Sequence, residues 1–104
     1  MKPCIYVLCS KDYRVDEIYI GSTMCPIQRS YFHGINVNKK NTKVYSFIRN
    51  TGGMSNWKMI IVEYCEVGIN RKELITKEAL WYRKLRPSLN MIPPRKYIEV
   101  YMDI

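Results

Sequence analysis

Apolar positions form short continuous runs near the start of the chain and helical spacings further on. Residues 4–9 (CIYVLC) are an uninterrupted apolar run that predicts a strand, and residues 18–20 (IYI) predict a second one. The polar stretch between them contains Asp12 and Asp16, which favour turns. The chain is therefore expected to begin with an antiparallel hairpin.

Two helices are predicted after this hairpin. Pro26 suits the first turn of a helix that Ser22 or Thr23 would cap and that would end at about residue 34. Residues 44–48 place apolar side chains at spacings of three and one, and a glycine pair soon afterwards would stop the helix. The middle of the chain is thus expected to be mainly helical.

The second half of the sequence predicts one strand and one longer helix. Residues 57–65 are apolar at both odd and even positions, which predicts a strand covered on both faces and, we expect, the central strand. Asn70 and Glu73 have capping-box spacing, opening a helix that ends before Pro87. Residues 95–104 follow a Pro-Pro break and predict an edge strand or a docking tail. We interpret residues 1–104 as one small α/β domain.

The composition fits a globular protein with a polyanionic partner. Hydrophobic residues make up 47% of the chain and charged residues 25%, values that argue against disorder. Seventeen Lys and Arg residues against nine Asp and Glu residues leave a net charge of +8. Because this charge is spread along the chain, with no basic amphipathic helix, it favours nucleic acid over a membrane surface. The apolar runs are also too short to span a bilayer, so no membrane partner is expected.

The cysteines point to a reducing compartment and away from a zinc site. Cys4, Cys9, Cys25 and Cys65 include no Cys-x-x-Cys pair, and only His33 could join them as a ligand. Cysteines within an apolar run commonly serve as small hydrophobic residues with reduced thiols. Since no secretory cleavage pattern follows the amino terminus, we expect the cytosol or the nucleus.

One carboxylate lies within an apolar stripe of the last predicted helix. At about 100° per residue, six apolar side chains share one face of this helix: Leu74, Ile75, Ala79, Trp81, Tyr82 and Leu85. Glu78 projects from near the middle of that face. A buried carboxylate needs a cation, a metal ion or a strong hydrogen-bonding network. Spacing alone leaves both a functional site and a simple ion pair with Arg or Lys open.

The helix that begins near Pro26 carries a second candidate pair. Arg29 and His33 are four residues apart and share one helix face. Arginine is a forked, permanently charged donor that suits phosphate, and histidine exchanges protons near neutral pH. Taken alone, these residues are also compatible with a surface arginine and a structural histidine, just as Tyr6 and Tyr19 are compatible with core packing.

Taken in order, these residues resemble the GIY-YIG nuclease family. The resemblance covers nearly the whole domain and rests on an ordered set of motifs: Cys4-Ile5-Tyr6, the stretch YIGST at residues 19–23, Arg29 with His33, Glu78 in a helix, and Asn90 after a leucine. The sequence departs from the family pattern at Cys4, where the family usually has glycine. Cysteine is small enough for a strand at this position.

The resemblance implies a small three-stranded antiparallel sheet flanked by helices, and a metal-dependent DNA endonuclease that hydrolyses phosphodiester bonds by in-line attack of water. Glu78 would hold the single Mg²⁺ or Mn²⁺ ion, because hard cations prefer oxygen ligands and need few carboxylates. Tyr6 would be the general base, with Tyr19 and His33 positioning the water or relaying its proton. A phenol with a pKa of ~10 is only about one part in a thousand ionised at pH 7, so Arg29 and the cation would have to lower it.

The remaining implied roles concern substrate binding and support of the site. Arg29 would stabilise charge on the transferred phosphoryl group, Asn90 would orient the site by hydrogen bonds, and Gly21 would allow close backbone approach or form a bend. Lysines that we expect to contact DNA, together with Arg29, are Lys11, Lys39 and Lys40. Lys11 is also the nearest candidate for the catalytic lysine of many relatives.

Two function classes remain open on the sequence alone. The first is the DNA endonuclease, and the second is a catalytically silent nucleic-acid-binding module of the same fold. Every catalytic position of the family is filled, which favours the enzyme. DNA is the expected partner in both cases, and a specificity subunit or a homodimer would be an additional one.

Overall fold

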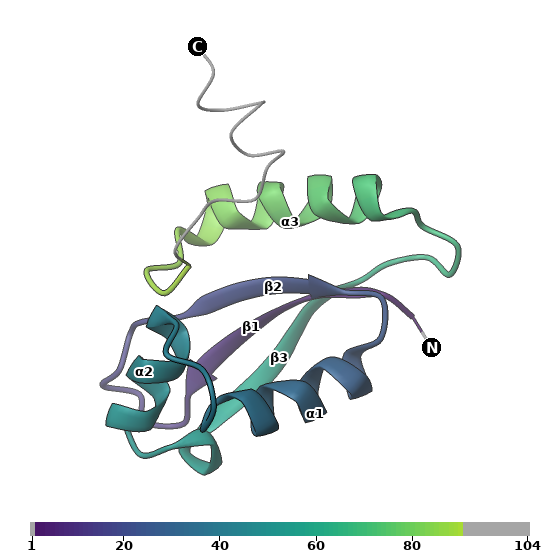
Figure 1. The fold of residues 1–104 in the computed structure, drawn as a ribbon. Helices are drawn as coiled ribbons and strands as arrows, with labels where there is room; N and C mark the ends of the chain where they lie inside the picture. Colours follow the sequence, from purple (N-terminus) through teal and green to yellow (C-terminus); the bar gives the residue numbers. More distant parts are fainter. Residues whose placement is uncertain (1, 91–104) are drawn as a thin grey trace.

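The computed structural model describes residues 2–90 and contains a three-stranded antiparallel sheet with helices on both faces (Figure 1). The strands are β1 (Cys4–Ser10), β2 (Tyr19–Thr23) and β3 (Trp57–Tyr64). The helices are α1 (Pro26–Asn36), α2 (Lys43–Asn50) and α3 (Arg71–Leu85), and a single 3₁₀ turn, η1 (Met54–Asn56), precedes β3. Helix α3 covers one face of the sheet, while α1 and α2 lie on the other. The predicted fold class is confirmed.

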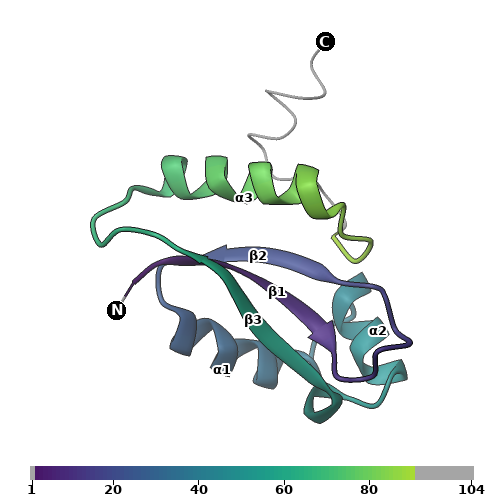
Figure 2. The same cartoon turned by 180° about the vertical axis from the view of Figure 1, so that it is seen from behind.

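Strand β1 is the centre of the sheet, with β2 and β3 antiparallel on either side of it (Figure 2). Ile5 and Val7 pack toward α3, whereas Tyr6 and Leu8 pack in a second cluster with residues of α2. The uninterrupted apolar run at residues 4–9 therefore reflects a strand covered on both faces. The predicted hairpin of β1 and β2 is confirmed, and β2 extends beyond the predicted residues 18–20 to Thr23 opposite Cys4.

The prediction that residues 57–65 form the central strand is wrong, because β3 pairs only with β1 and lies at the edge. Its odd-numbered apolar residues, including Trp57, pack into the cluster that contains α2. On the other face, Ile60 is 40% exposed, and at the end of the strand Tyr64, which lies opposite Cys4 beyond a β-bulge, is 60% exposed. The apolar residues at both odd and even positions of β3 therefore do not indicate that both of its faces are buried.

The predicted cap of α1 is also wrong. The N-cap residue is Cys25, which makes no side-chain capping hydrogen bond, and the helix continues past residue 34 to Asn36. The Thr23 hydroxyl instead accepts from the Cys25 N–H, and Ser22 points its hydroxyl toward α3, where it bonds to Glu78. Pro26 does lie in the first turn, as predicted.

Helix α3 begins and ends as its sequence predicts. The Asn70 side chain accepts from the Glu73 N–H at 2.8 Å, and the helix stops where Arg86 adopts a left-handed conformation (φ 47°) before Pro87. No helix within residues 2–90 is long and apolar enough to cross a membrane. The predicted edge strand or docking tail at residues 95–104 lies outside the described residues.

Candidate active site

Tyr6, His33 and Tyr45 form one hydrogen-bonded chain between β1, α1 and α2. The Tyr6 hydroxyl lies 2.7 Å from His33 Nε2, and the Tyr45 hydroxyl lies 2.8 Å from His33 Nδ1. All three residues are buried. Both imidazole nitrogens are occupied by phenols, so His33 is placed to exchange protons with tyrosines and not to ligate a metal ion.

Burial keeps these three hydrogen-bonded side chains uncharged. Burial, with a smaller contribution from the Arg29 guanidinium, lowers the pKa of His33 to about 4. Burial also raises the pKa of the Tyr6 phenol, and the lowering effect of Arg29 is too small to reverse that rise. The expectation that Arg29 would make Tyr6 easier to ionise is therefore met in direction but outweighed in size. At neutral pH the imidazole has one N–H, so one phenol donates to the ring and the other accepts from it.

Gly21 allows the Tyr6 ring to reach His33. Tyr6 and Gly21 are opposite each other in the β1–β2 register, and a Cβ added at Gly21 would lie only 2.5 Å from the Tyr6 hydroxyl oxygen. Any side chain at this position would collide with the ring. Gly21 therefore leaves the space that the Tyr6 ring occupies.

Glu78 lies on the side of α3 that packs over β2. Its Oε1 accepts a hydrogen bond of 2.6 Å from the Ser22 hydroxyl. Burial raises the pKa of the Glu78 carboxyl, while the Ser22 hydrogen bond and the Arg29 charge oppose that rise. Within residues 2–90 the ion pairs are Arg14–Asp12 and Lys77–Glu63. The alternative that Glu78 is simply paired with a lysine or arginine is thus not what the described residues form.

A single divalent cation fits the chemistry of this carboxylate. In the described part of the chain, no three His, Cys, Asp or Glu side chains gather into a metal-binding group. Mg²⁺ commonly takes one or two carboxylates and completes its shell with water and substrate phosphate. A cation beside Glu78 would also favour the charged carboxylate, which burial disfavours. Glu78 is the side chain that would hold the ion.

Asn90 holds the free edge of β2. Its side-chain Oδ1 accepts from the Ile20 N–H and its Nδ2 donates to the Ile20 carbonyl, both at 2.9 Å. These backbone groups belong to the residue between Tyr19 and Gly21, on an edge strand. Asn90 therefore acts like a short additional strand and fixes the segment that carries the second tyrosine.

A cavity of about 360 Å³ gathers four of the six predicted catalytic residues. It is lined, among others, by Tyr19, His33, Lys40, Tyr45, Glu78 and Asn90. Tyr19 faces the imidazole edge-on, with ring centroids 6.2 Å apart. Residues 71 positions apart in the chain thus meet at one cavity, beside the buried Tyr6 hydroxyl.

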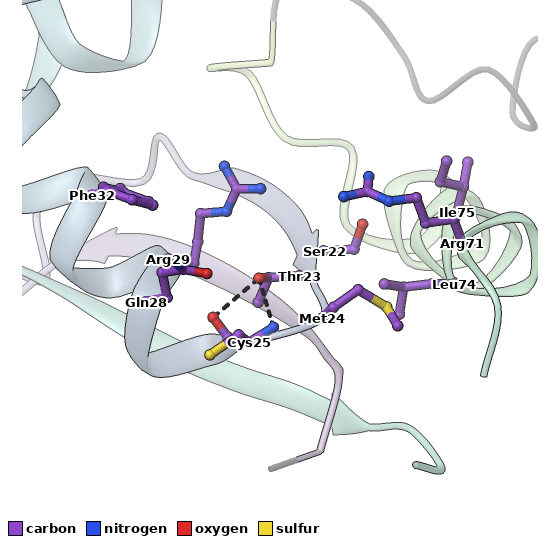
Figure 3. A pocket seen from close by; sticks show the side chains of 10 residues that line it. All are labelled: Ser22, Thr23, Met24, Cys25, Gln28, Arg29, Phe32, Arg71, Leu74 and Ile75. Carbon is purple, nitrogen blue, oxygen red and sulfur yellow. Dashed lines mark hydrogen bonds between the residues drawn. The ribbon is translucent and has the colours of Figure 1, made fainter. Parts of the chain in front are cut away.

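Arg29 stands at the border between this cavity and a neighbouring cleft. Its side chain is exposed and lines the cleft together with Ser22 (Figure 3). Its charge still reaches the cavity, because it lowers the pKa of the Tyr6 and Tyr19 phenols and of the Glu78 carboxyl. Arg29 is therefore free to bind an anion that approaches the buried groups.

The predicted lysines occupy different places. Lys40 lines the cavity, and its loop is fixed by Arg49, whose guanidinium donates to the Lys40 carbonyl at 2.8 Å. Lys39 is exposed in the same loop. Lys11 lies past the end of β1, where its ammonium donates to the Ser55 carbonyl. Lys40, and not Lys11, is the lysine next to the candidate active site.

Sequence reasoning did not single out Tyr45 or the role of Ser22. Tyr45 lies in α2 beside Val44, and its apolar neighbours gave no reason to separate it from the core. The sequence indicates Ser22 only as part of the YIGST stretch and as a candidate helix cap. The signal that could have found it is its place directly after Gly21, since a strand residue alternates faces and so points away from Tyr6 toward α3.

Comparison with known proteins agrees with this geometry. The family model described as the GIY-YIG catalytic domain matches residues 2–91. No curated protein and no solved structure gives a significant match. Since the matched residues cover most of the 104-residue chain, with two tyrosines, an arginine, a histidine, a glutamate and an asparagine around one site, the chain belongs to the GIY-YIG nuclease family.

Proposed function

We propose that this chain is a DNA endonuclease that hydrolyses phosphodiester bonds with the help of one divalent cation. The observation that carries the proposal is the shared cavity, in which the Glu78 carboxylate lies with Tyr19 and His33 beside the hydrogen-bonded Tyr6. A nuclease needs an anchor for a cation, a route for a proton and a positive charge for phosphate. Glu78, the Tyr6–His33 hydrogen bond and Arg29 would supply these three in turn.

Glu78 would hold the cation, which we expect to be Mg²⁺ or Mn²⁺. When bound, such an ion supplies Lewis-acid polarisation of the phosphate and stabilises negative charge on the leaving 3′ oxygen. The Ser22 hydroxyl donates to Oε1 and so fixes the orientation of the carboxylate. This hydrogen bond makes Ser22 a positioning residue for Glu78.

The hydrogen bond between Tyr6 and His33 provides the route for the proton of the attacking water. Because burial makes a free Tyr6 phenolate costly, we infer that Tyr6 passes its own proton to His33 Nε2 while it receives one from water. The proton then rests on the imidazole and no isolated phenolate forms. Neutral His33 is the state that can accept this proton.

Arg29 links substrate binding to this relay. Its charge lowers the pKa of His33, so a phosphate bound to Arg29 would cancel part of that effect and make His33 a better proton acceptor. The same guanidinium would stabilise the charge that develops on the phosphoryl group. Substrate binding would thus help to activate the relay.

Cleavage of supercoiled plasmid by the purified protein tests the proposal. We expect nicking or linearisation with Mg²⁺ or Mn²⁺, and none when EDTA is present. Glu78→Gln should lower the rate roughly 10³-fold or more, since metal ions contribute several kcal/mol of transition-state stabilisation. Glutamine keeps an oxygen that can accept from Ser22, so the variant should stay folded.

Glu66→Gln is the matched control, because it removes the same charge at an exposed position in the segment between β3 and α3. We expect it to cut like the wild type. Equal cutting by Glu78→Gln would contradict the proposed metal ligand. Wild-type protein that binds DNA but never cuts it would instead support the catalytically silent binding module.

A further inference from the structure

A second positively charged cleft adjoins the candidate active site. It has a volume of about 270 Å³ and lies between α1 and α3 at the end of β2. Arg29 projects from α1 on one side, Arg71 projects from α3 on the other, and Ser22 lies between the two helices (Figure 3). Arg71 belongs to none of the motifs that the proposed function uses.

Among residues 2–90, neither arginine forms a salt bridge with an acidic side chain. None of the ten residues that line the cleft is acidic, and the two ion pairs within residues 2–90 involve neither Arg29 nor Arg71. Two permanent cations on the walls of one cleft repel each other, and an anion between them removes that repulsion. The planar, forked guanidinium group matches phosphate oxygens in particular.

The cleft leads directly to the carboxylate that would hold the metal ion. Ser22 lines the cleft and also donates to Glu78. Arg71 precedes Glu78 by seven residues in α3, which is nearly two full turns, so both lie on one helix face about 10 Å apart along the axis. Beyond Glu78 the cavity continues to Lys40. Arg71 and Arg29 thus line the cleft that contains Ser22, and Lys40 lines the cavity that contains its partner Glu78.

The cleft also offers apolar surface for the sugars and bases of a nucleic acid. Phe32 is 43% exposed and Met24 is 39% exposed, and both line the cleft beside the arginines. Exposed aromatic side chains next to cations are typical of surfaces that contact nucleic-acid strands. A small inorganic anion would contact the arginines but not Phe32 or Met24.

We propose that this cleft binds the backbone of the DNA strand that is cut, and that Arg71 holds a phosphate a few nucleotides away from the scissile one. The inference rests on the proposed nuclease function and adds a binding residue to it. With a rise of 3.4 Å per nucleotide along the duplex axis, about 10 Å corresponds to roughly three nucleotides. Because Arg71 contacts a non-reacting phosphate, it contributes to binding and not to the chemical step.

The test measures binding of a fluorescently labelled DNA duplex in Ca²⁺ at several salt concentrations, and cleavage in Mg²⁺ or Mn²⁺. Arg71→Ala should raise Kd roughly tenfold, as expected for loss of one charged hydrogen-bonding contact. The slope of log K against log salt should become shallower by about 0.9, the value for one phosphate on duplex DNA. The rate at saturating DNA should change less than about threefold, since the contact is uniform between ground and transition states.

Lys72→Ala is the matched control, because Lys72 is the next residue, is exposed and has the same charge, but does not line the cleft. It should change Kd less than about twofold and leave the salt slope in place, since distant surface charges are screened. Arg71→Lys should keep the wild-type slope while losing part of the affinity, because lysine preserves the charge without the fork.

Neutral methylphosphonates placed singly along the cut strand locate the contact. One of them, within about three nucleotides of the cut, should weaken the wild type but not weaken Arg71→Ala any further. If Arg71→Ala and Lys72→Ala behave alike while the wild type cuts DNA, the inference is wrong and the nuclease function stands. A loss of rate at unchanged Kd would also overturn it, because Arg71 would then act on the reacting phosphate. Wild-type protein that neither binds nor cuts DNA would overturn both.

Discussion

The tight contact between Gly21 and the Tyr6 ring predicts that Gly21→Ala destabilises and inactivates the protein, whereas Gly34→Ala is tolerated. An alanine Cβ at residue 21 would lie 2.5 Å from the Tyr6 hydroxyl oxygen and 2.6 Å from ring carbon Cζ. Tyr6 is only 1% exposed, so its ring has no free space to enter. The ring must shift, and the 2.7 Å hydrogen bond to His33 must lengthen or break.

Two effects set the size of the loss in stability. Overpacking of a well-packed core costs about 1–3 kcal/mol, and leaving a buried hydrogen-bonding group without its partner costs about 1–3 kcal/mol. A total of about 2–6 kcal/mol follows, which at roughly 4 °C per kcal/mol corresponds to a fall in Tm of roughly 8–24 °C for a domain of this size. Loss of a positioned proton acceptor should also lower kcat by roughly 10²–10⁴-fold.

Thermal unfolding by circular dichroism and single-turnover cleavage provide the two readouts. Gly34→Ala is the control, because an added Cβ at this position in α1 meets no atom within 4 Å. Alanine should stabilise the helix there by roughly 0.5–1 kcal/mol. If Gly21→Ala melts and cuts like the wild type, the Tyr6 ring is not held against β2 and the account of the relay is wrong.

Three further changes probe the groups around His33. Burial lowers the pKa of His33 to about 4, so as the pH falls the unfolded chain binds a proton on this residue before the folded protein does. The contribution of neutral His33 to the free energy of unfolding is therefore complete above pH 6.5 and falls by about 3 kcal/mol as the pH drops to 4. Urea melts of His33→Gln should lack this part of the pH dependence, and a pH dependence identical to that of the wild type would contradict a buried neutral imidazole. Tyr45→Phe removes the bond to Nδ1 and should lower stability by about 1–3 kcal/mol and shift the pH–rate profile, whereas an unchanged profile would exclude Tyr45 from the relay. Asn90→Ala removes both bonds to Ile20 and should lower Tm and kcat together, with about 1–3 kcal/mol lost, while exposed Asn38→Ala should change neither; equal behaviour of the two variants would show that β2 needs no clamp.

The hairpin and the last helix could be predicted because their signals are local. An unbroken apolar run, a capping pair at Asn70 and Glu73, and a proline after the helix each act within a few residues of the structure they specify. The order of the strands in the sheet is not determined by such local signals. Residues 57–65 are apolar at both odd and even positions, which favours a central strand, yet β1 occupies the centre. The exposed side chains of β3 show that this pattern also occurs at the edge of a sheet.

The site was predictable as a set of residues but not as a network. The family pattern contains Tyr6, His33 and Glu78, and the structure brings them to one region. Their hydrogen-bonding partners come from elsewhere in the chain: Tyr45 lies in a different helix from His33, and Ser22 meets Glu78 across 56 positions. Such contacts depend on how helices pack against the sheet, which residue spacing does not encode.

The most direct test of the account is single-turnover cleavage of an end-labelled duplex at increasing Mn²⁺ concentration, with wild type and Glu78→Gln compared at saturating protein. We predict a wild-type rate that saturates with Mn²⁺ and products that carry 5′-phosphate and 3′-hydroxyl ends, as expected when the 3′ oxygen is the leaving group. Glu78→Gln should stay roughly 10³-fold slower at every Mn²⁺ concentration. A Glu78→Gln variant that reaches the wild-type rate with the same Mn²⁺ dependence would contradict the claim that this half-buried carboxylate anchors the reaction.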